Sequence, residues 1–499
     1  MRPTPTTRRN LLRAIAGGAA AGALGALWPR RGRAAAEGPR FLIVLTAEGG
    51  ASVIDGPMAI RASESPAAAT LNCYPDPAVA NVEGTPFRAV AAQHEALGPI
   101  PYKFASDQAP FVKKHAADMM VATLRGTSVN HLVAQRRSVT GNEAWSGRTL
   151  QEAVALQYGE GALLPNVHLT TGNGFTEPGG DPSLPARCLG EPVAEPRLWP
   201  LSLHGSRGTS AGDRPDLVAR ARALREGKLE PAAAFGGVFR NSPALEQWRE
   251  ARGPARDGVE AADLISRLML YPEGPGLPLS QYGLSTSPDA AALWARFPNV
   301  ATDPLDAQAA LAFLLIKYRI SVAVTLGPGG QFVFDGDGPG GLRGAVYNPP
   351  IAFDFSHQGH RATQGFMWDR IYRVADGLID LLKAEEFGGG ESLWDRTVIY
   401  VATDFGRTKG RPANAPDFGT GHDLNNGVVL LSPLVNGGKL LGGVDPATAL
   451  TYGFDPETGA PDPNRQTTER EVYAGILHAL RVDTAGSGLP DVRAMRKTA

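Results

Sequence analysis

Carboxylates and imidazoles gather in three short segments in the second half of the chain. They lie at residues 354–360 (Asp-Phe-Ser-His-Gln-Gly-His), 403–408 (Thr-Asp-Phe-Gly-Arg-Thr) and 419–423 (Gly-Thr-Gly-His-Asp), and they hold three of the nine histidines. Carboxylate and imidazole without thiolate suit a hard or borderline divalent metal such as Zn, Mn, Mg or Ca. We therefore expect metal ligands here, while a loop cap or a surface histidine explains any single position equally well.

These segments follow or flank runs of residues that are typical of regular elements. Apolar, β-branched runs predict strands at residues 40–46, 118–124, 320–326, 397–402 and 427–432, and helical spacing predicts helices at 149–157, 306–318, 366–386 and 469–480. Alternating strands and helices indicate an α/β fold with a mainly parallel sheet covered on both faces. Ligands bind beyond the carboxyl ends of such strands, which directs attention to Glu48 after the first strand.

The three segments carry a resemblance to a known family. Asp354–His357, Asp404–Thr408 and Gly419–Asp423 occur in the order seen in a large secreted bacterial family. It is catalogued as domain of unknown function 1501 and is similar to the alkaline phosphatase and sulfatase superfamily. Family members usually show Asp-Thr-His, Glu-Phe-Gly-Arg-Thr and Asp-His at these places, so each departure moves a candidate ligand. The resemblance covers most of residues 40–480 and is weakest at about 172–300.

The resemblance implies a three-layer α/β/α sandwich of the alkaline phosphatase type that holds one or two divalent metals. It places an acidic ligand after the first strand and further ligands in each of the three segments, with His357 and His360 as alternatives beside Asp354. Asp55 and Asp423 are weaker candidates. The metal ligands implied in this way are Glu48, Asp354, His357, His360, Asp404 and His422.

The same resemblance points to a nucleophile position. Sulfatase-like enzymes place Cys, Ser or Thr at a helix N-terminus, ten residues before the Gly of a Thr-Gly pair, and counting back from Gly141 gives His131. Imidazole can be a nucleophile or a ligand, and a ligand or structural role for His131 is equally compatible. Thr127 or Ser128 would take this place if the register slips. Arg407 is the second candidate catalytic residue, since it could contact an oxyanion bidentately or else bridge loop carboxylates.

Charge and composition exclude several classes of protein. The 499 residues are 43% hydrophobic and 20% charged, as in globular chains. Residues 1–36 hold seven arginines and no acid, so the rest of the chain has 42 basic and 50 acidic residues, which argues against nucleic-acid binding. We expect residues 37–499 to form one domain with a variable insertion at about 172–300. Cys73 and Cys188 could pair in an oxidising compartment or remain free thiols.

The first 36 residues predict an export signal. Arg8-Arg9 form a twin-arginine pattern, an apolar stretch runs from Ala14 to Trp28, and Ala34-Ala35-Ala36 offers a cleavage site. The stretch is short of the roughly 20 residues needed to span a bilayer. We therefore expect a periplasmic or secreted protein that meets the twin-arginine translocase during export and has no integral membrane segment in its mature chain.

Two functions are compatible with these features. The first is an exported metal-dependent hydrolase that acts on phosphate or sulfate esters of a small molecule or glycan. The alternative is a non-catalytic metal- or glycan-binding envelope protein on the same fold, which the missing Ser, Thr or Cys nucleophile favours. The one G-x-S-x-G match, Gly208–Gly212, lies in the Gly- and Pro-rich stretch at 172–215 and follows no predicted strand, so we expect no nucleophile elbow there. Hydrolysis would then depend on the metal as a Lewis acid.

Overall fold

The structure is a computed structural model of the chain. It describes residues 38–96, 103–170, 172–193, 195–202, 215–243, 245–246, 249, 263–328, 330–334, 344–348 and 352–497. The predicted export signal at residues 1–36 lies outside the described residues, as do parts of the predicted insertion at 203–214 and 250–262.

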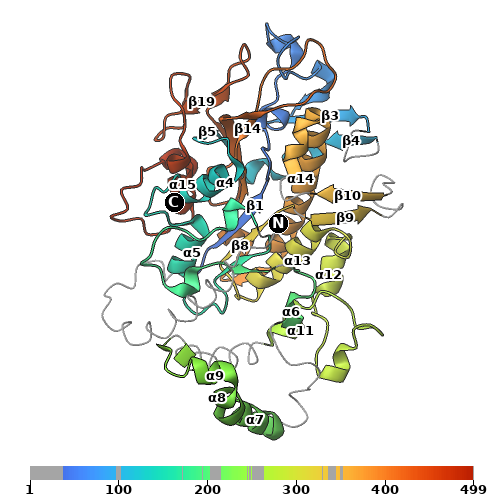
Figure 1. Cartoon of the computed structure of the whole chain (residues 1–499). Coiled ribbons are helices and arrows are strands. Elements are labelled where there is room, and N and C mark those ends of the chain that lie inside the picture. Colours follow the sequence, from blue (N-terminus) through green and yellow to red (C-terminus); the bar gives the residue numbers. More distant parts are fainter. Residues whose placement is uncertain are drawn as a thin grey trace.

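One eight-stranded sheet forms the centre of the molecule (Figure 1), in the order β17-β5-β16-β13-β1-β8-β6-β7. All its neighbouring strands pair in parallel except at β16, which is antiparallel to both β13 and β5. Every residue of β1 is buried, as expected for a central strand flanked on both faces. The strands are β1 (Phe41–Thr46), β5 (Met119–Arg125), β6 (Asn166–His168), β7 (Glu191–Pro192), β8 (Ala323–Leu326), β13 (Thr397–Ala402), β16 (Asn425–Leu431) and β17 (Lys439–Leu441).

Helices cover the sheet in two groups (Figure 1). The first group is α4 (His131–Thr140), α5 (Leu150–Tyr158) and α15 (Glu469–Ala479), and the second is α13 (Pro304–Lys317) and α14 (His360–Ala384). In α13 every residue from Leu305 to Ile316 is buried. The sheet and its helices therefore share one large hydrophobic core.

Smaller elements surround this core. Short helices are α3 (Ala109–His115), α6 (Trp199–Ser202), α11 (Leu264–Leu268) and α12 (Ala290–Arg296). Small sheets are formed by β2 (Val79–Asn81), β3 (Arg88–His94) and β4 (Phe104–Asp107), by β9 (Gly330–Phe334) with β10 (Gly344–Asn348), by β11 (Glu386–Gly388) with β12 (Glu391–Ser392), by β14 (Gly406–Arg407) with β15 (His422–Asp423), and by β18 (Gly443–Val444), β19 (Thr451–Phe454) and β20 (Pro461–Asp462).

The predicted mixed α/β fold with a mainly parallel sheet is confirmed. Two predicted details differ. The strand predicted at 427–432 is present, but it is antiparallel to both of its neighbours. The sequence did not reveal this direction, because a continuous apolar run indicates burial and not strand direction. The helix predicted from Phe366 begins at His360, because its first turns bury polar side chains such as Gln364, which hydrogen-bonds Ser52 and Gly50.

The described residues contain no helix with the length and apolar character needed to cross a bilayer. The two cysteines are both buried, Cys73 in a small cluster with Ile54 and Ile60 and Cys188 in the main core, and they do not form a disulfide.

Candidate metal centre

Several chain segments meet at one edge of the sheet. Glu48 follows β1 and Asp404 follows β13, so both stand beyond the carboxyl ends of parallel strands. β16 runs the other way, and its first residue, Asn425, pairs with Arg125 at the end of β5. The antiparallel direction therefore brings His422, just before β16, to the same edge.

His131 reaches this edge from the start of α4. The helix begins with Asn130 as its N-cap, whose side chain accepts a hydrogen bond from the Val133 N–H, which satisfies an otherwise unpaired amide of the first turn. The helix ends at Gly141, which has a φ of 63°. A Cβ there would lie 2.7 Å from Tyr473 Cβ, so only glycine fits.

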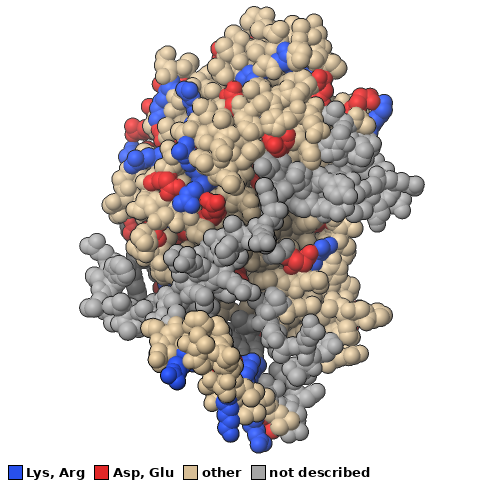
Figure 2. Space-filling view, viewed as in Figure 1, with Lys and Arg blue, Asp and Glu red and all other residues tan. Residues whose placement is uncertain are grey.

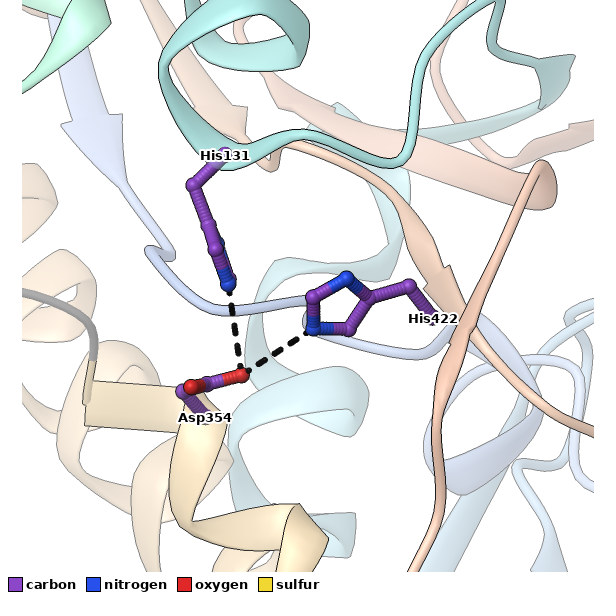
Figure 3. Close-up of side chains that lie close together, drawn as sticks. All are labelled: His131, Asp354 and His422. Carbon is purple, nitrogen blue, oxygen red and sulfur yellow. Dashed lines mark hydrogen bonds and ion pairs between the residues drawn. The ribbon is translucent and has the colours of Figure 1, made fainter.

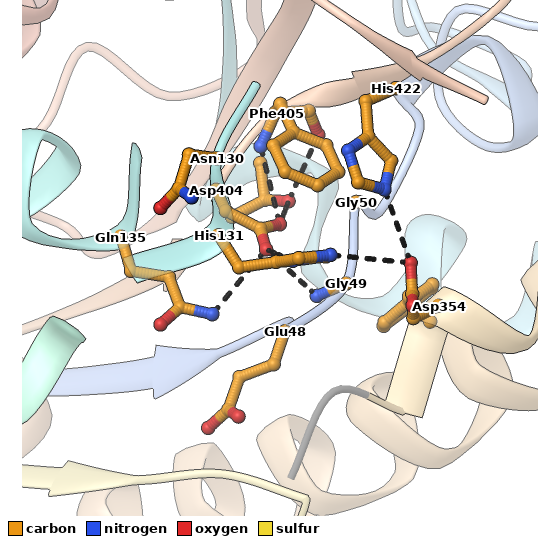
Figure 4. A network of polar contacts seen from close by, with 12 residues as sticks. Glu48, Gly49, Gly50, Asn130, His131, Gln135, Asp354, Asp404, Phe405 and His422 are labelled. Carbon is orange, nitrogen blue, oxygen red and sulfur yellow. Dashed lines mark hydrogen bonds and ion pairs between the residues drawn. The ribbon is translucent and has the colours of Figure 1, made fainter. Parts of the chain in front are cut away.

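Asp354 is the common partner of the cluster (Figures 3 and 4). Its Oδ1 lies 3.5 Å from His131 Nε2, 3.0 Å from His357 Nε2 and 3.4 Å from His422 Nε2. The His357 and His422 Nε2 atoms are 3.0 Å apart. Ligand atoms of His131, Asp354 and His422 all lie within 4.8 Å of one another, close enough to share one ion. Bound ligands lie about 2.0–2.2 Å from Zn, so small side-chain movements would suffice.

The other ring nitrogen of two of these histidines is held by an acceptor. His131 Nδ1 lies 2.8 Å from Asp404 Oδ2, and His422 Nδ1 lies 2.9 Å from the Val129 carbonyl oxygen. A carbonyl and a carboxylate accept hydrogen bonds only, so Nδ1 carries the proton in both rings. Each Nε2 is then the nitrogen that faces Asp354, and it can bind a metal once any proton on it is displaced. Metal-binding histidines are commonly oriented by this second contact.

Phe405 forms a wall behind the two histidines. Its ring stacks on His422 with centroids 4.0 Å apart and contacts His131 at 4.7 Å. The Phe405 side chain is buried, so the two imidazoles are held against a fixed apolar surface.

Arg407 is fully buried and holds the loops together. Its Nη2 donates to Asp354 Oδ1 at 2.7 Å, to the Phe353 carbonyl at 3.2 Å and to the Gly49 carbonyl, and its Nη1 donates to the Thr420 carbonyl at 3.3 Å. These contacts fit the predicted bridging role, and they leave little of the guanidinium for a substrate. They also depend on the turn after β1. Gly50 has a φ of 89°, and a Cβ there would lie 2.8 Å from Arg407 Nε.

Asp404 and Glu48 lie behind the cluster rather than in it. Besides His131, Asp404 Oδ2 accepts the Gly49 N–H at 3.2 Å and the Gln135 amide at 3.4 Å. Glu48 is fully buried, and its Oε1 accepts hydrogen bonds from Thr46 at 3.0 Å and Asn173 at 2.6 Å, whereas its Oε2 has no hydrogen-bond partner. In Figure 4 the Glu48 carboxylate points away from Asp354 and His422.

His360 lies outside the cluster although it is only three residues from His357. It is completely buried, with Nε2 2.9 Å from Asp55 Oδ2 and Nδ1 2.9 Å from the Thr420 hydroxyl. Tyr74 and Asn72 also donate to Asp55. This network ties the segment carrying Asp354 to the segment carrying His422, and it uses both ring nitrogens of His360.

The local electrostatics follow from these contacts. Burial disfavours the charged form of His131, but hydrogen bonds to Asp354 and Asp404 outweigh it and raise its pKa to about 9. Burial also opposes ionisation of Asp354, yet the hydrogen bonds from His131 and Arg407 keep its pKa well below its usual range. Burial lowers the pKa of His422 and raises that of Glu48 well above its usual range.

The alternative nucleophiles Thr127 and Ser128 are engaged elsewhere. The Thr127 hydroxyl donates to Glu469 Oε2 at 2.7 Å, and the Ser128 hydroxyl accepts the Asn130 N–H at 3.1 Å. Arg136 and Arg137, which flank the same helix turn, bind Glu143 and the Thr127 carbonyl respectively. His131 is therefore the residue of this segment that faces the cluster.

Of the residues predicted from sequence, the structure brings together His131, Asp354, His357, His422 and Arg407. Asp404 joins them through His131, while Glu48 and His360 bind other partners. Sequence reasoning missed three orienting groups, Asn173, Gln135 and the Val129 carbonyl. An amide side chain or a backbone carbonyl carries no sequence signal of such a role, because any residue supplies a carbonyl.

Comparison with known proteins adds no relative: no family model, no curated protein and no solved structure matches this chain.

Proposed function

We propose that the chain is an exported metal-dependent hydrolase that acts on phosphate or sulfate esters. The observation that carries the proposal is the convergence of His131, Asp354 and His422 within 4.8 Å, with the Nδ1 atoms of both histidines already held by acceptors. Two imidazoles whose Nε2 atoms face one carboxylate oxygen form a donor set for a divalent metal once the metal displaces the Nε2 proton of His131. The resemblance to the alkaline phosphatase and sulfatase superfamily supplies the substrate class.

The donor set favours Zn or Mn among the four metals considered. Three imidazole nitrogens and one carboxylate oxygen are available, if His357 is counted with the other three residues. Mg and Ca prefer oxygen ligands throughout, whereas Zn binds mixed nitrogen and oxygen sets readily. When bound, such a metal acts as a Lewis acid on an ester oxygen and lowers the pKa of water to about 7 in favourable sites.

The protein's own residues would orient this chemistry. Asp404 accepts a hydrogen bond from Nδ1 of His131 and thereby fixes its ring. The Val129 carbonyl accepts the corresponding hydrogen bond from His422. Arg407 holds Asp354 in place from its buried side. The His131 side chain is 19% exposed and that of Asp354 29%, so the cluster is partly accessible from solvent.

His131 fits the ligand role better than the nucleophile role. Its Nε2 points to the same oxygen as the His422 Nε2, and a nitrogen that donates its lone pair to a metal cannot attack an ester at the same time. The attacking group would then be water, and the absence of a Ser, Thr or Cys at this position is no obstacle.

Metal content and hydrolysis test the proposal together. Protein purified from the periplasm is analysed for bound metal and assayed with p-nitrophenyl phosphate and p-nitrophenyl sulfate. We expect about one Zn or Mn per chain and hydrolysis that a chelator abolishes. His422→Ala should lose the metal and the hydrolysis. His478→Ala is the control and should keep both, because the His478 ring contacts Thr484 and Asp491. Hydrolysis that survives chelation would refute the proposal.

A non-catalytic metal-binding envelope protein is the second candidate. It is favoured by the engagement of Thr127, Arg136 and Arg137 with other partners and by the burial of Arg407. Few groups in this part of the described structure are then left to bind the substrate anion. Stoichiometric metal that depends on His422, without turnover of either ester, would favour this second function.

A further inference from the structure

A helical arm extends from the body of the molecule. It comprises residues 215–243 and contains α7 (Pro215–Leu224), a π-helical turn (Arg225–Leu229), α8 (Glu230–Ala232) and α9 (Ala234–Val238). Figure 1 shows α7, α8 and α9 set apart from the sheet and its covering helices. Among the residues from 216 to 240 whose exposure is described, Gly236 is the one that is buried. The arm therefore packs little of its own surface against the body.

The arm exposes an unusual share of large apolar side chains. Twelve large hydrophobic residues are exposed in the described part of the chain, and half of them lie in the arm. An isolated helix of this length is marginal in water without a packing partner, and clustered exposed apolar residues mark an interaction site. The six are Leu217 (45%), Leu224 (49%), Leu229 (60%), Phe235 (62%), Val238 (75%) and Phe239 (47%).

Three of these residues form one apolar ridge. Phe235, Val238 and Phe239 stand at i, i+3 and i+4, so they share one face of the turn at α9. The Phe235 and Phe239 rings are 4.7 Å apart. Two aromatic rings and a valine thus project together from the arm.

The arm also carries an excess of positive charge. The arm has five basic residues and three acidic ones, although the chain beyond residue 36 has an acidic excess. Arg220, Lys228 and Arg240 are exposed and form no ion pair with any other described residue, whereas Arg225 pairs with Glu226 and Glu230. Figure 2 shows Lys and Arg gathered at this end of the molecule, with little acidic surface between them.

We propose that the helical arm binds an anionic lipid surface, with Phe235, Val238 and Phe239 inserted among the lipids and Arg220, Lys228 and Arg240 at the headgroups. An apolar ridge with flanking cations is the pattern of helices that lie in a membrane interface, where the apolar side penetrates about 5–10 Å. Basic residues near such a surface add attraction to anionic headgroups. A stable protein interface instead needs about 800 Å² per partner, more than three side chains on one turn provide.

Vesicle sedimentation tests this inference. The full-length purified protein is mixed with vesicles of phosphatidylcholine containing 30% phosphatidylglycerol, and with vesicles of phosphatidylcholine alone. We expect binding to the anionic vesicles that weakens with salt, and at least tenfold weaker binding to the neutral ones. The triple variant Phe235→Ser/Val238→Ser/Phe239→Ser should bind anionic vesicles at least tenfold more weakly, and Lys228→Glu/Arg240→Glu should lose the preference for them.

A matched control removes apolar surface elsewhere. Leu163→Ser/Leu450→Ser changes two residues that are 41% and 40% exposed but lie outside the arm, and it should bind like the unmodified protein. All changed side chains are exposed, so circular dichroism should show unaltered folding. Equal binding by the triple variant would overturn the proposal. So would a dimer that the triple variant converts to monomer while no vesicles are bound, since the partner would then be a second copy of the chain.

Discussion

Two clusters of histidine and aspartate in this protein have similar residue types but differ in the charged residues that contact them. The candidate metal centre joins His131, Asp354 and His422, and the other cluster joins His115, Asp376 and Asp380. In the second cluster, Lys114 Nζ lies 2.7 Å from a carboxylate oxygen of each aspartate. Arg296 also pairs with both aspartates.

The two clusters also differ in how their histidines are oriented. The free Nδ1 of His115 is buried without a hydrogen-bond partner, and its Nε2 faces Asp376 at 2.7 Å. In the candidate metal centre an acceptor fixes Nδ1 of both His131 and His422, so the Nε2 atoms are the ones turned toward Asp354. A histidine beside two carboxylates is therefore not sufficient to indicate a metal site. In the second cluster two cations, Lys114 and Arg296, pair with the carboxylates, whereas Arg407 is the one guanidinium among the described residues that contacts Asp354. The second cluster also lacks, in the described structure, an acceptor for the other ring nitrogen of its histidine.

The largest expected effect comes from neutralising Asp354, with the equivalent change of Asp376 as the comparison. Asp354→Asn should lower metal affinity at least a hundredfold, since it removes a charged ligand shared by the histidines. Asp376→Asn should leave bound metal unchanged, because that carboxylate serves Lys114 and Arg296. Metal content by mass spectrometry after dialysis checks both. Retention of metal by Asp354→Asn, or its loss from Asp376→Asn, would reverse the assignment of the two clusters.

A smaller effect is expected from the orienting contact. Asp404→Asn keeps the shape of the side chain but replaces one acceptor oxygen with a donor, so His131 loses its strongest Nδ1 partner. Metal affinity should fall about 10–100-fold, the usual cost of losing such a second contact. Titration with Zn in a competing chelator measures it. Asp380→Asn, in the other cluster, is the matched control and should titrate like the unmodified protein.

The smallest effect concerns the pH dependence of stability at the cluster of His115, Asp376 and Asp380. Burial opposes ionisation of Asp376, but hydrogen bonds from Lys114, His115 and Arg296 lower its pKa to about 2. The unfolded chain binds this proton near pH 3.9. The ion pairs thus stabilise the fold above about pH 4, and their contribution is lost as the pH falls toward 2.

This contribution should amount to about 1 kcal/mol after allowance for solvent screening. Urea unfolding at pH 3 and pH 6 measures it. Asp376→Asn should be less stable than the unmodified protein at pH 6, and the gap should narrow at pH 3. A gap that is equal at both pH values would mean that the ion pairs add no stability.

Sequence reasoning found the strands better than their directions. The residues of β1 and β13 are apolar on both faces of the strand, which is typical of strands in the middle of a sheet that is covered on both sides. The run that became β16 has the same composition, yet its reversal is set by pairing with two neighbours from distant parts of the chain. The antiparallel direction of β16 places His422 at the edge of the sheet where the other candidate ligands lie. The position of His422 could therefore not be predicted from the residues around it in the sequence.

The site itself was predictable at the level of residue type. In the sequence Asp354, His357 and His422 stand in short segments rich in polar and glycine residues, where functional side chains concentrate. In the structure these segments are a 3-10 helix (Ala352–His357) and the two-residue strand β15. His360 has the same character in sequence but is the first residue of α14 and faces inward to Asp55. Contacts such as His131 with Asp404, which are 273 residues apart, arise from the tertiary fold alone.

The short pairing of β14 with β15 sets which side chain faces Asp354 in the candidate metal centre. It consists of two residue pairs, Gly406 with Asp423 and Arg407 with His422. Neighbouring residues of a strand point to opposite faces, so a slip of one residue would turn His422 away and present Asp423 instead. A nitrogen donor would give way to an oxygen donor, and the preferred ion would shift from Zn toward Mg or Ca. A single insertion or deletion between residues 408 and 421 could therefore change metal selectivity without altering either candidate ligand.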